Sequence, residues 1–400
     1  MNTTDWRAGA KELMPMVVAL RREIHRHPER GLHLPETTRR AREALEGLDV
    51  QFAEGPQTSG MIVTLRGSQQ GPTILLRGDM DALPMPEDTG LEFASEVENT
   101  MHACGHDAHT AMLVGAVHLL HRNRESLNGT VKFMFQPGEE GFHGARYMIE
   151  DGLLDAAPKP QAAFAIHISP NIPSGVIACR PGPMMAASDK IEIVITGKGG
   201  HASQPHLTLD PVPAACETVL ALQSFVTRRT DAFDPVILSI SQISAGTAIN
   251  VVPERAELRG TLRSFSEKSR EFARAGIVRV TEGIAKTHGL EAHVELKPGY
   301  PVTRNDATFV AFARGVTENL LGSRGYLEMP APLMGAEDFS YVLQRMPGCM
   351  MFLGVAPEGV DHHHAHACHS NRMMLNEDAL ANGVALHAAI ADAFLSQSQA

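Results

Sequence analysis

The sequence predicts an α/β protein in which a mixed sheet is covered by helices and a ferredoxin-like α+β domain is inserted. The chain has 400 residues, more than one hydrophobic core usually organises, so two domains are expected. Between residues 60 and 185, short apolar runs alternate with helical segments, as in sheets covered by helices. From residue 188 to 300 the expected order is strand, helix, strand, strand, helix, strand, which is typical of a compact α+β module.

The first domain is expected over residues 1–187 and 301–400. At its N-terminus, apolar residues recur at helical spacing before Arg21 and Arg22, which predicts an amphipathic helix and not a signal peptide. Polar residues follow several of its strands, at the carboxyl ends where open α/β sheets build their sites. The expected strands are GMIVTLRG, PTILLRGDMDALP, GTVKFMFQPGEEG, AAFAIHISP and GCMMFLGV, and the expected helices include HTAMLVGAVHLLHRN and NEDALANGVALHAAIADAFL.

The inserted domain, residues 188–300, begins with the strand KIEIVITGKGGHAS and the helix LDPVPAACETVLALQSFVTRR. Two strands follow, PVILSISQISAG and AELRGTLRSF, then a helix over residues 270–288 and the strand EAHVELKPGYP. We expect this order to give one sheet with helices packed on it.

The composition and charge of the chain argue against several classes of binding partner. The net charge of -11 and the lack of a basic cluster argue against nucleic acid and anionic membranes, both of which require a basic face. No apolar run approaches the roughly 20 residues of a membrane span. The five cysteines are scattered and odd in number, which favours reduced thiols and a cytoplasmic location over a disulfide framework.

Side chains of the kind that bind metals occur at five places on predicted strand ends or loops. Each is commonly structural when alone: an isolated DxD is mostly a turn, a single histidine after a strand is mostly a structural residue, and a lone cysteine is a small buried hydrophobe. Their joint placement at one edge of one predicted sheet indicates a metal site. The five places are Asp79 and Asp81, Cys104 and His106, Glu139 and Glu140, His167, and His369.

The mixture of imidazole, thiolate and carboxylate suits Zn²⁺, Mn²⁺, Co²⁺ or Ni²⁺ and is poor for Ca²⁺ or Mg²⁺. Five donors exceed the three that one catalytic zinc usually takes from a protein, so two ions are expected. Such ions lower the pKa of a bound water to about 7, and a carboxylate that is not a ligand must then take the proton. Glu139 and Glu140 can divide these roles, since consecutive side chains in an extended stretch point to opposite sides. The alternative for this pair is a solvated acidic turn.

Seven motifs, taken together and in order, resemble the M20 family of metallo-amidohydrolases and peptidases. The resemblance is greatest to the branch of hippurate hydrolase, N-acyl-amino-acid amidohydrolases and auxin-conjugate hydrolases, and it covers residues from about 15 to 390. It implies two divalent ions in the α/β domain, and an inserted domain that serves as a lid and as the dimerisation surface of a homodimer or higher homo-oligomer. The motifs are RREIHRHPE, GDMDALP, MHACGHDAHTAM, QPGEEG, GGHASQPH, NVVPE and GAEDFS.

The resemblance also implies roles for single residues. Glu139 would be the general base, and Asp81 the carboxylate that orients a ligand. His201 would polarise the scissile carbonyl and Asn250 would bind the polar end of the substrate; without the resemblance they would be a turn histidine and an edge-loop asparagine. The implied metal ligands are Cys104, His106, Glu140, His167 and His369, with His362, His363, His364 and His366 as rivals of the last. His369 is preferred because LNEDAL, which follows it, matches the start of the family's next helix.

The function implied is hydrolysis of the amide bond of a small N-acyl amino acid, such as a hippurate-like substrate, to a carboxylic acid and a free amino acid. Two alternatives stay open. One is a dipeptidase or carboxypeptidase on the same scaffold. The other is a non-catalytic metal-binding protein built on DHHHAHACH, for which the paired glutamates would have no use.

Overall fold

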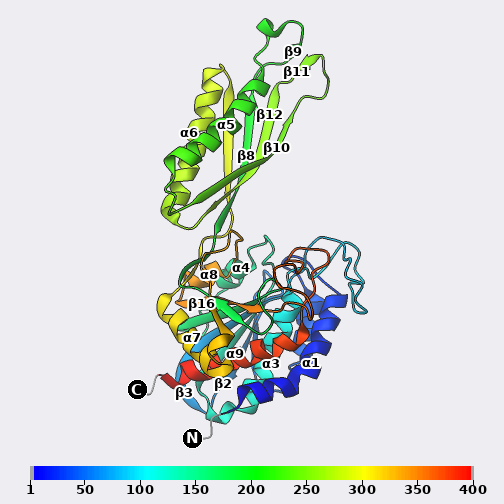
Figure 1. The fold of residues 1–400 in the computed structure, drawn as a ribbon, viewed down its shortest axis with the longest axis vertical. Coiled ribbons are helices and arrows are strands. Elements are labelled where there is room, and N and C mark those ends of the chain that lie inside the picture. Colours follow the sequence, from blue (N-terminus) through cyan, green and yellow to red (C-terminus); the bar gives the residue numbers. More distant parts are fainter. Residues whose placement is uncertain (1–3, 398–400) are drawn as a thin grey trace. The chain divides into compact units, whose positions relative to one another are not determined.

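The computed structural model describes residues 4–397, which form two compact units. The second unit comprises Met185–Thr303 and Pro332–Glu337, and the rest of the described residues form the first (Figure 1). The short segment Pro332–Glu337 was expected in the first domain. Its grouping with the second has a local cause, because Ala186 N donates to the carbonyl oxygens of Leu333 (3.1 Å) and Gly335 (2.8 Å).

An eight-stranded mixed sheet forms the centre of the first unit, in the order β1-β2-β4-β3-β5-β16-β6-β15. The pairs β4–β3, β3–β5 and β5–β16 are parallel, and β1–β2 and β2–β4 are antiparallel. All of the strands predicted for this domain are present, and the short β1, β6 and β15 are additional. The strands are β1 Gln51–Glu54, β2 Met61–Arg66, β3 Gln69–Asp79, β4 Asn128–Gln136, β5 Ala162–Ser169, β6 Ile177–Cys179, β15 Tyr326–Glu328 and β16 Gly348–Gly354.

Helices cover this sheet, as predicted. The apolar run of β16 is buried along its whole length, as expected of a strand covered on both faces. Helices α1, α3 and α9 contact one another in the first unit (Figure 1). Its helices are α1 Trp6–Arg26, α2 Pro35–Glu43, α3 His106–Arg122, α4 Gly144–Glu150, α7 Ala307–Leu321, α8 Ser340–Leu343 and α9 Leu380–Gln397.

Contrary to the expectation from the sequence, one segment of the described residues, Glu377–Ser396, is long and apolar enough to cross a membrane. However, 72% of its 18-residue apolar window is buried inside the structure. It consists mainly of α9, which contacts α1, α3, α7 and the strands β3 and β4. Its apolar residues therefore belong to the core of the first unit.

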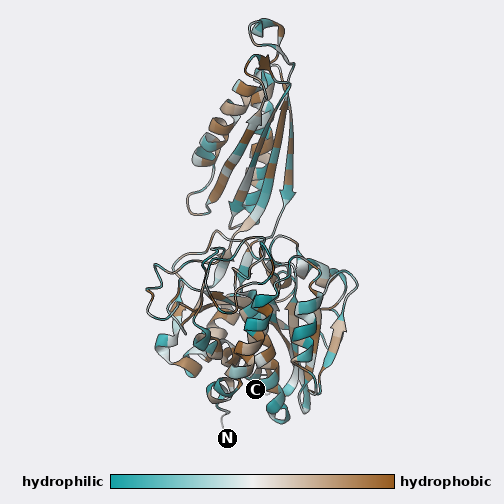
Figure 2. Cartoon of the chain, turned by 90° about the vertical axis from the view of Figure 1, so that its right-hand side faces the viewer, coloured by the Kyte–Doolittle hydropathy of each residue, from teal (hydrophilic) through white to brown (hydrophobic). Residues whose placement is uncertain are grey.

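The second unit has the predicted β-α-β-β-α-β order, formed by β8 Ala187–Thr196, α5 Pro211–Arg229, β10 Val236–Ala245, β12 Arg255–Ser264, α6 Glu267–Thr287 and β13 Glu291–Pro298. The sheet order is β10-β12-β8-β13 with every pair antiparallel, which confirms the ferredoxin-like arrangement. Burial alternates along β8, and Figure 2 shows the matching alternation of hydropathy along these strands. A separate pair of short strands, β9 Gly200–His201 and β11 Val251–Val252, also belongs to this unit.

Capping side chains fix where several helices start. Asp5 accepts from the backbone N–H groups of Arg7 and Ala8 at the start of α1, and Asp306 does the same for α7. Asp210 caps α5, whose first residue is Pro211, and Ser266 caps α6. The short strands β7 Gly182–Met185 and β14 Thr303–Asn305 lie where the chain passes from one unit to the other.

Candidate metal centre

The parallel strands β3, β4 and β5 direct their carboxyl ends to one edge of the large sheet. Strand β3 ends at Asp79, β4 ends shortly before Glu139, and His167 lies near the end of β5. Helix α3 begins at His106, two residues after Cys104. This edge therefore collects the predicted metal-binding residues of the first unit, as is common at the carboxyl edge of α/β sheets.

Gly105 allows Cys104 and His106 to contribute to the same site. Its φ of +80° lies in the left-handed region, and a Cβ atom there would lie 2.5 Å from Cγ1 of Ile168. Only glycine adopts this conformation at this close approach without strain. The resulting tight turn before α3 places two donors on one short loop.

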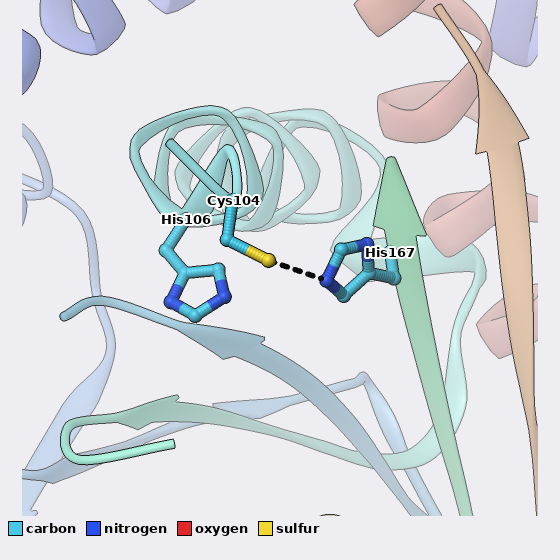
Figure 3. Close-up of side chains that lie close together, drawn as sticks. All are labelled: Cys104, His106 and His167. Atoms are coloured by element: carbon cyan, nitrogen blue, oxygen red, sulfur yellow. Dashed lines mark hydrogen bonds between the residues drawn. The ribbon is translucent and has the colours of Figure 1, made fainter. Parts of the chain in front are cut away.

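Cys104, His106 and His167 form a buried group whose donor atoms all lie within 4.8 Å of one another (Figure 3). The Cys104 sulfur lies 3.4 Å from Nε2 of His167. The other ring nitrogen of His167, Nδ1, donates to the carbonyl oxygen of Ile168 at 2.6 Å. Because a carbonyl only accepts, Nδ1 carries the hydrogen, and the lone pair of Nε2 points toward the sulfur.

Two further groups overlap this one. Cys104, Glu140 and His369 have donor atoms within 4.8 Å of one another, and so have His106, Glu139 and Glu140. Nε2 of His369 lies 3.2 Å from Oε1 of Glu140. The structure thus brings all five predicted ligands and the predicted base Glu139 into one continuous cluster.

Asp81 holds the backbone of the two glutamates. Its Oδ1 accepts the N–H of Glu139 at 2.9 Å and its Oδ2 accepts the N–H of Glu140 at 3.0 Å. Oδ1 also lies 3.4 Å from Nδ1 of His106. Asp81 is buried, so the turn that carries Glu139 and Glu140 is held by hydrogen bonds that are shielded from solvent.

His369 has a φ of +70°, which is rare for a residue other than glycine and indicates backbone strain. Its N–H donates to the carbonyl oxygen of Ala103 at 2.7 Å, next to Cys104. Among the histidines that were possible ligands, His369 therefore reaches the cluster through both its backbone and its side chain, whereas His362 and His363 form a separate group with Asp361.

The charges of the cluster fit divalent cations. Both ring nitrogens of His106 are buried without a hydrogen bond. Burial alone would lower the pKa of His106, but the carboxylates of Asp79, Asp81 and Glu140 raise it to about 10, so these surroundings favour a positive charge. A divalent ion would supply that charge and displace the ring proton, which leaves His106 neutral as a ligand. Burial holds the pKa of His167 well below its usual value, so this ring is neutral, as a metal ligand must be.

The surroundings of Cys104 also favour a bound cation. A hydrogen bond with Cys368, burial and the nearby glutamates raise the pKa of the Cys104 thiol well above its usual value. A thiolate is stable in such surroundings only when a cation compensates its charge. Buried imidazoles, a thiol and carboxylates are together a donor set for zinc-like ions.

His109 was assigned no role from the sequence, yet it lies directly behind the cluster. Its Nδ1 donates to Oδ1 of Asp79 at 2.5 Å, and its Nε2 accepts the backbone N–H of Ile168 at 2.8 Å. It therefore ties the end of β3 to the residue that follows His167. The signal that could have revealed it is the spacing of His106 and His109, since residues i and i+3 share one face of a helix.

The first motif, RREIHRHPE, also has a structural role. Arg21 Nε and His25 Nδ1 lie 3.0 and 2.8 Å from Oδ2 of Asp107, the residue after His106. Burial opposes a charge on His25, but Asp107 raises its pKa to about 9, so the pair is ionic at neutral pH. These contacts fix α1 to the first turn of α3.

His201 and Asn250 lie in the second unit and not in the cluster. His201 is an exposed residue of β9, paired with Val251, and its Nδ1 lies 2.7 Å from the hydroxyl of Ser203. The carbonyl oxygen of Asn250 accepts the N–H of Ala202 at 3.0 Å. The two residues are thus neighbours on exposed backbone of the second unit.

Comparisons with known proteins identify the family of this chain. Residues 75–393 match the profile described as Peptidase family M20/M25/M40. An N-acetylcysteine deacetylase of Bacillus subtilis (strain 168) is 39% identical over 366 residues, 91% of this chain and 93% of the relative. Thermostable carboxypeptidase 1 of Saccharolobus solfataricus is 38% identical over 391 residues, 96% of each chain. A solved Bacillus subtilis structure, described as a dinuclear metal binding peptidase from the M20 family, has a TM-score of 0.82 at 35% identity and covers 96% of this chain and 99% of its own.

Proposed function

We propose that this chain, which belongs to peptidase family M20/M25/M40, is a metal-dependent amidohydrolase of N-acyl amino acids. The reaction cleaves the amide bond and releases a carboxylic acid and a free amino acid. The observation that carries the proposal is the overlap of three donor groups, one of which includes Glu139 beside Glu140. The likeness to an N-acetylcysteine deacetylase supports an N-acyl amino acid as the substrate class.

Two divalent ions of the Zn²⁺, Mn²⁺, Co²⁺ or Ni²⁺ type are proposed at this site, where they would supply Lewis acidity and lower the pKa of a bound water. The proposed ligands are Cys104, His106, Glu140, His167 and His369. The likeness to a dinuclear metal binding peptidase supports the number of ions.

Glu139 is proposed as the general base. It lies in the group formed with His106 and Glu140, and its backbone is held by Asp81. It takes a proton from the attacking water and returns it to the nitrogen of the departing amino acid. Asp81 acts as a positioning residue, since it fixes the turn that carries Glu139.

His201 and Asn250 are proposed to contact the substrate, His201 by polarising the scissile carbonyl and Asn250 by binding the polar end. Both are exposed, so their side chains can take part in recognition. Hydrogen-bond donors to a developing oxyanion are often worth several kcal/mol. We further propose a homodimer that uses the second unit, and a cytoplasmic location, which the scattered free cysteines favour.

The second candidate is a carboxypeptidase or dipeptidase, which the likeness to thermostable carboxypeptidase 1 favours. Both candidate substrates are amides of an amino acid, so the proposed metal ligands and the base Glu139 could hydrolyse either of them. The metal-depleted enzyme, reloaded separately with each of the four ions, should be assayed on N-acetyl and N-benzoyl amino acids and on dipeptides.

The proposal expects kcat/KM to be highest for an N-acyl amino acid and to disappear in metal-depleted enzyme. A preference for dipeptides would replace the proposed substrate class by the second candidate. No turnover of any substrate with any ion would favour the non-catalytic metal-binding protein. A Glu139→Gln preparation, purified identically, controls for contaminating hydrolases.

A further inference from the structure

Side chains of the kind that bind metals also gather outside the cluster, on the segment of residues 361–366, which reads DHHHAH. Asp361, His362 and His363 offer donor atoms that all lie within 4.8 Å of one another. Oδ1 of Asp361 lies 3.4 Å from Nδ1 of His362. Two donors on a tetrahedral ion with bonds of about 2.0–2.1 Å lie about 3.3–3.4 Å apart, so the separation of this pair is compatible with a shared ion.

Hydrogen bonds fix the backbone of this segment. Nδ2 of Asn171 donates to the carbonyl oxygens of His362 and Ala365, both at 3.0 Å. The N–H of His363 donates to Oδ1 of Asp361 at 3.0 Å, and the N–H of His364 donates to the carbonyl oxygen of Asp361 at 2.8 Å. Binding an ion therefore requires side-chain rotation but no rearrangement of the segment, which lowers the entropic cost of binding.

The side chains are accessible and chemically suited to a transition-metal ion. Asp361 and His363 are exposed and His362 is half-buried, with the His362 and His363 ring centroids 4.0 Å apart. The pKa of the Asp361 carboxyl lies below its usual value, mainly because the backbone of His363 donates to it, so it is anionic at neutral pH. Two imidazoles and one carboxylate suit Zn²⁺, Co²⁺ or Ni²⁺ and leave further positions for water.

We propose that Asp361, His362 and His363 form a third metal site, on the surface of the first unit, for a divalent transition-metal ion such as Zn²⁺. This site is separate from the cluster at the sheet edge, which uses His369 further along the same segment. Its exposure means that the bound ion exchanges with solvent and is held more weakly than ions in the buried cluster. It adds a metal-binding function that hydrolysis of the substrate does not require.

The test uses full-length protein loaded with Zn²⁺ and freed of excess by gel filtration, with its starting content measured by elemental analysis. Zinc is then titrated in competition with a chromogenic zinc chelator. The wild type should take up one further ion per chain. His362→Ala/His363→Ala should weaken that uptake by more than about tenfold, since two of three protein ligands are lost. Asp361→Asn should give an intermediate loss.

A matched control removes two exposed histidines elsewhere, His33 and His293. His33→Ala/His293→Ala should bind the additional ion as the wild type does.

Equal zinc uptake by the wild type and His362→Ala/His363→Ala would overturn the proposal, as would an equal loss in the control. The comparison depends only on the difference between variants after loading, so it is independent of the number of ions in the cluster. A failure of the proposed hydrolase activity would leave this result unchanged.

Discussion

The sulfur of Cys104 lies 3.4 Å from Nε2 of His167, which joins the loop before α3 to strand β5 at the edge of the sheet. Cys104 also belongs to the group with Glu140 and His369, so its removal affects both groups of donors. We therefore expect Cys104→Ala to bind fewer than two ions per chain and to weaken metal affinity by at least about 10–100-fold. Elemental analysis after dialysis against a weak chelator measures this.

Cys216→Ala is the control, because Cys216 is an exposed free cysteine in the second unit. It should keep the metal content of the wild type. Two ions held with unchanged affinity by Cys104→Ala would show that the thiol is not a ligand.

A buried network of ion pairs lies next to the cluster and includes Asp79 at the end of β3. Arg77 lies 2.7 Å from Asp79 and 3.1 Å from Asp338, and all three side chains are buried. Arg77→Met keeps the length of the side chain but leaves these carboxylates without the guanidinium. Breaking a buried pair in this way costs about 3–5 kcal/mol, so the free energy of unfolding should fall by that amount in urea titrations.

The matched change is Arg39→Met, which removes exposed ion pairs with Glu36 and Glu43. Surface pairs contribute little, so the urea midpoint should not shift measurably. If both variants unfold at the wild-type midpoint, the Arg77 network does not stabilise the first unit.

His387, in α9, makes stability depend on pH. Burial lowers its pKa to about 3, whereas in the unfolded chain it is about 6.5. Between these two pKa values, His387 is protonated in the unfolded chain and neutral in the folded protein. The free energy of unfolding therefore falls as the pH drops from 6.5 to about 3. His387→Leu should reduce this slope by ~1.4 kcal/mol per pH unit.

Urea titrations of metal-depleted protein at several pH values in this window give the slope. A change in packing shifts the free energy of unfolding equally at every pH. The slope of this free energy against pH measures only the difference in bound protons between the unfolded and folded states. His33→Leu, at an exposed position, serves as the control and should keep the wild-type slope. An unchanged slope in His387→Leu would mean that this residue takes up no proton on unfolding.

His201 is the residue of the second unit proposed to contact the reacting carbonyl. His201→Ala should lower kcat by about 10²–10³-fold, as the loss of an oxyanion donor does, without changing the metal content. His206→Ala, an exposed histidine close by in the sequence, should leave kcat nearly unchanged. Equal kcat values for the wild type and His201→Ala would remove His201 from the mechanism.

Much of this structure follows from local patterns. Apolar runs predict β2, β3, β4, β5 and β16, and strand–helix order predicts the second unit, because burial on a sheet imposes those patterns. The clustering of Cys104 with Glu140 and His369 depends on chain segments far apart in sequence. The parallel arrangement of the strands predicts that these segments meet at one edge of the sheet. The distances between their side chains depend on the three-dimensional packing, which the sequence pattern does not give.

Other features have no local pattern. The role of His109 depends on Asp79 and the backbone of Ile168, neither of which is near it in sequence. The left-handed backbone of His369 occurs together with a hydrogen bond to the distant Ala103, and neither could be predicted from the local sequence CHSN. Pro332–Glu337 joins the second unit through backbone hydrogen bonds, which carry no side-chain signature.

The most direct test of the account is the effect of Glu139→Gln on metal content and on turnover, measured on one preparation. The amide keeps the size of the side chain but can neither take a proton from water nor return it to the leaving amine. We expect the metal content of the wild type, since Glu140 and the other proposed ligands are intact, and a fall in kcat of about 10²–10⁴-fold on N-acyl amino acids. Near-normal turnover with the metals in place would contradict the assignment of Glu139 as the base and with it the proposed mechanism.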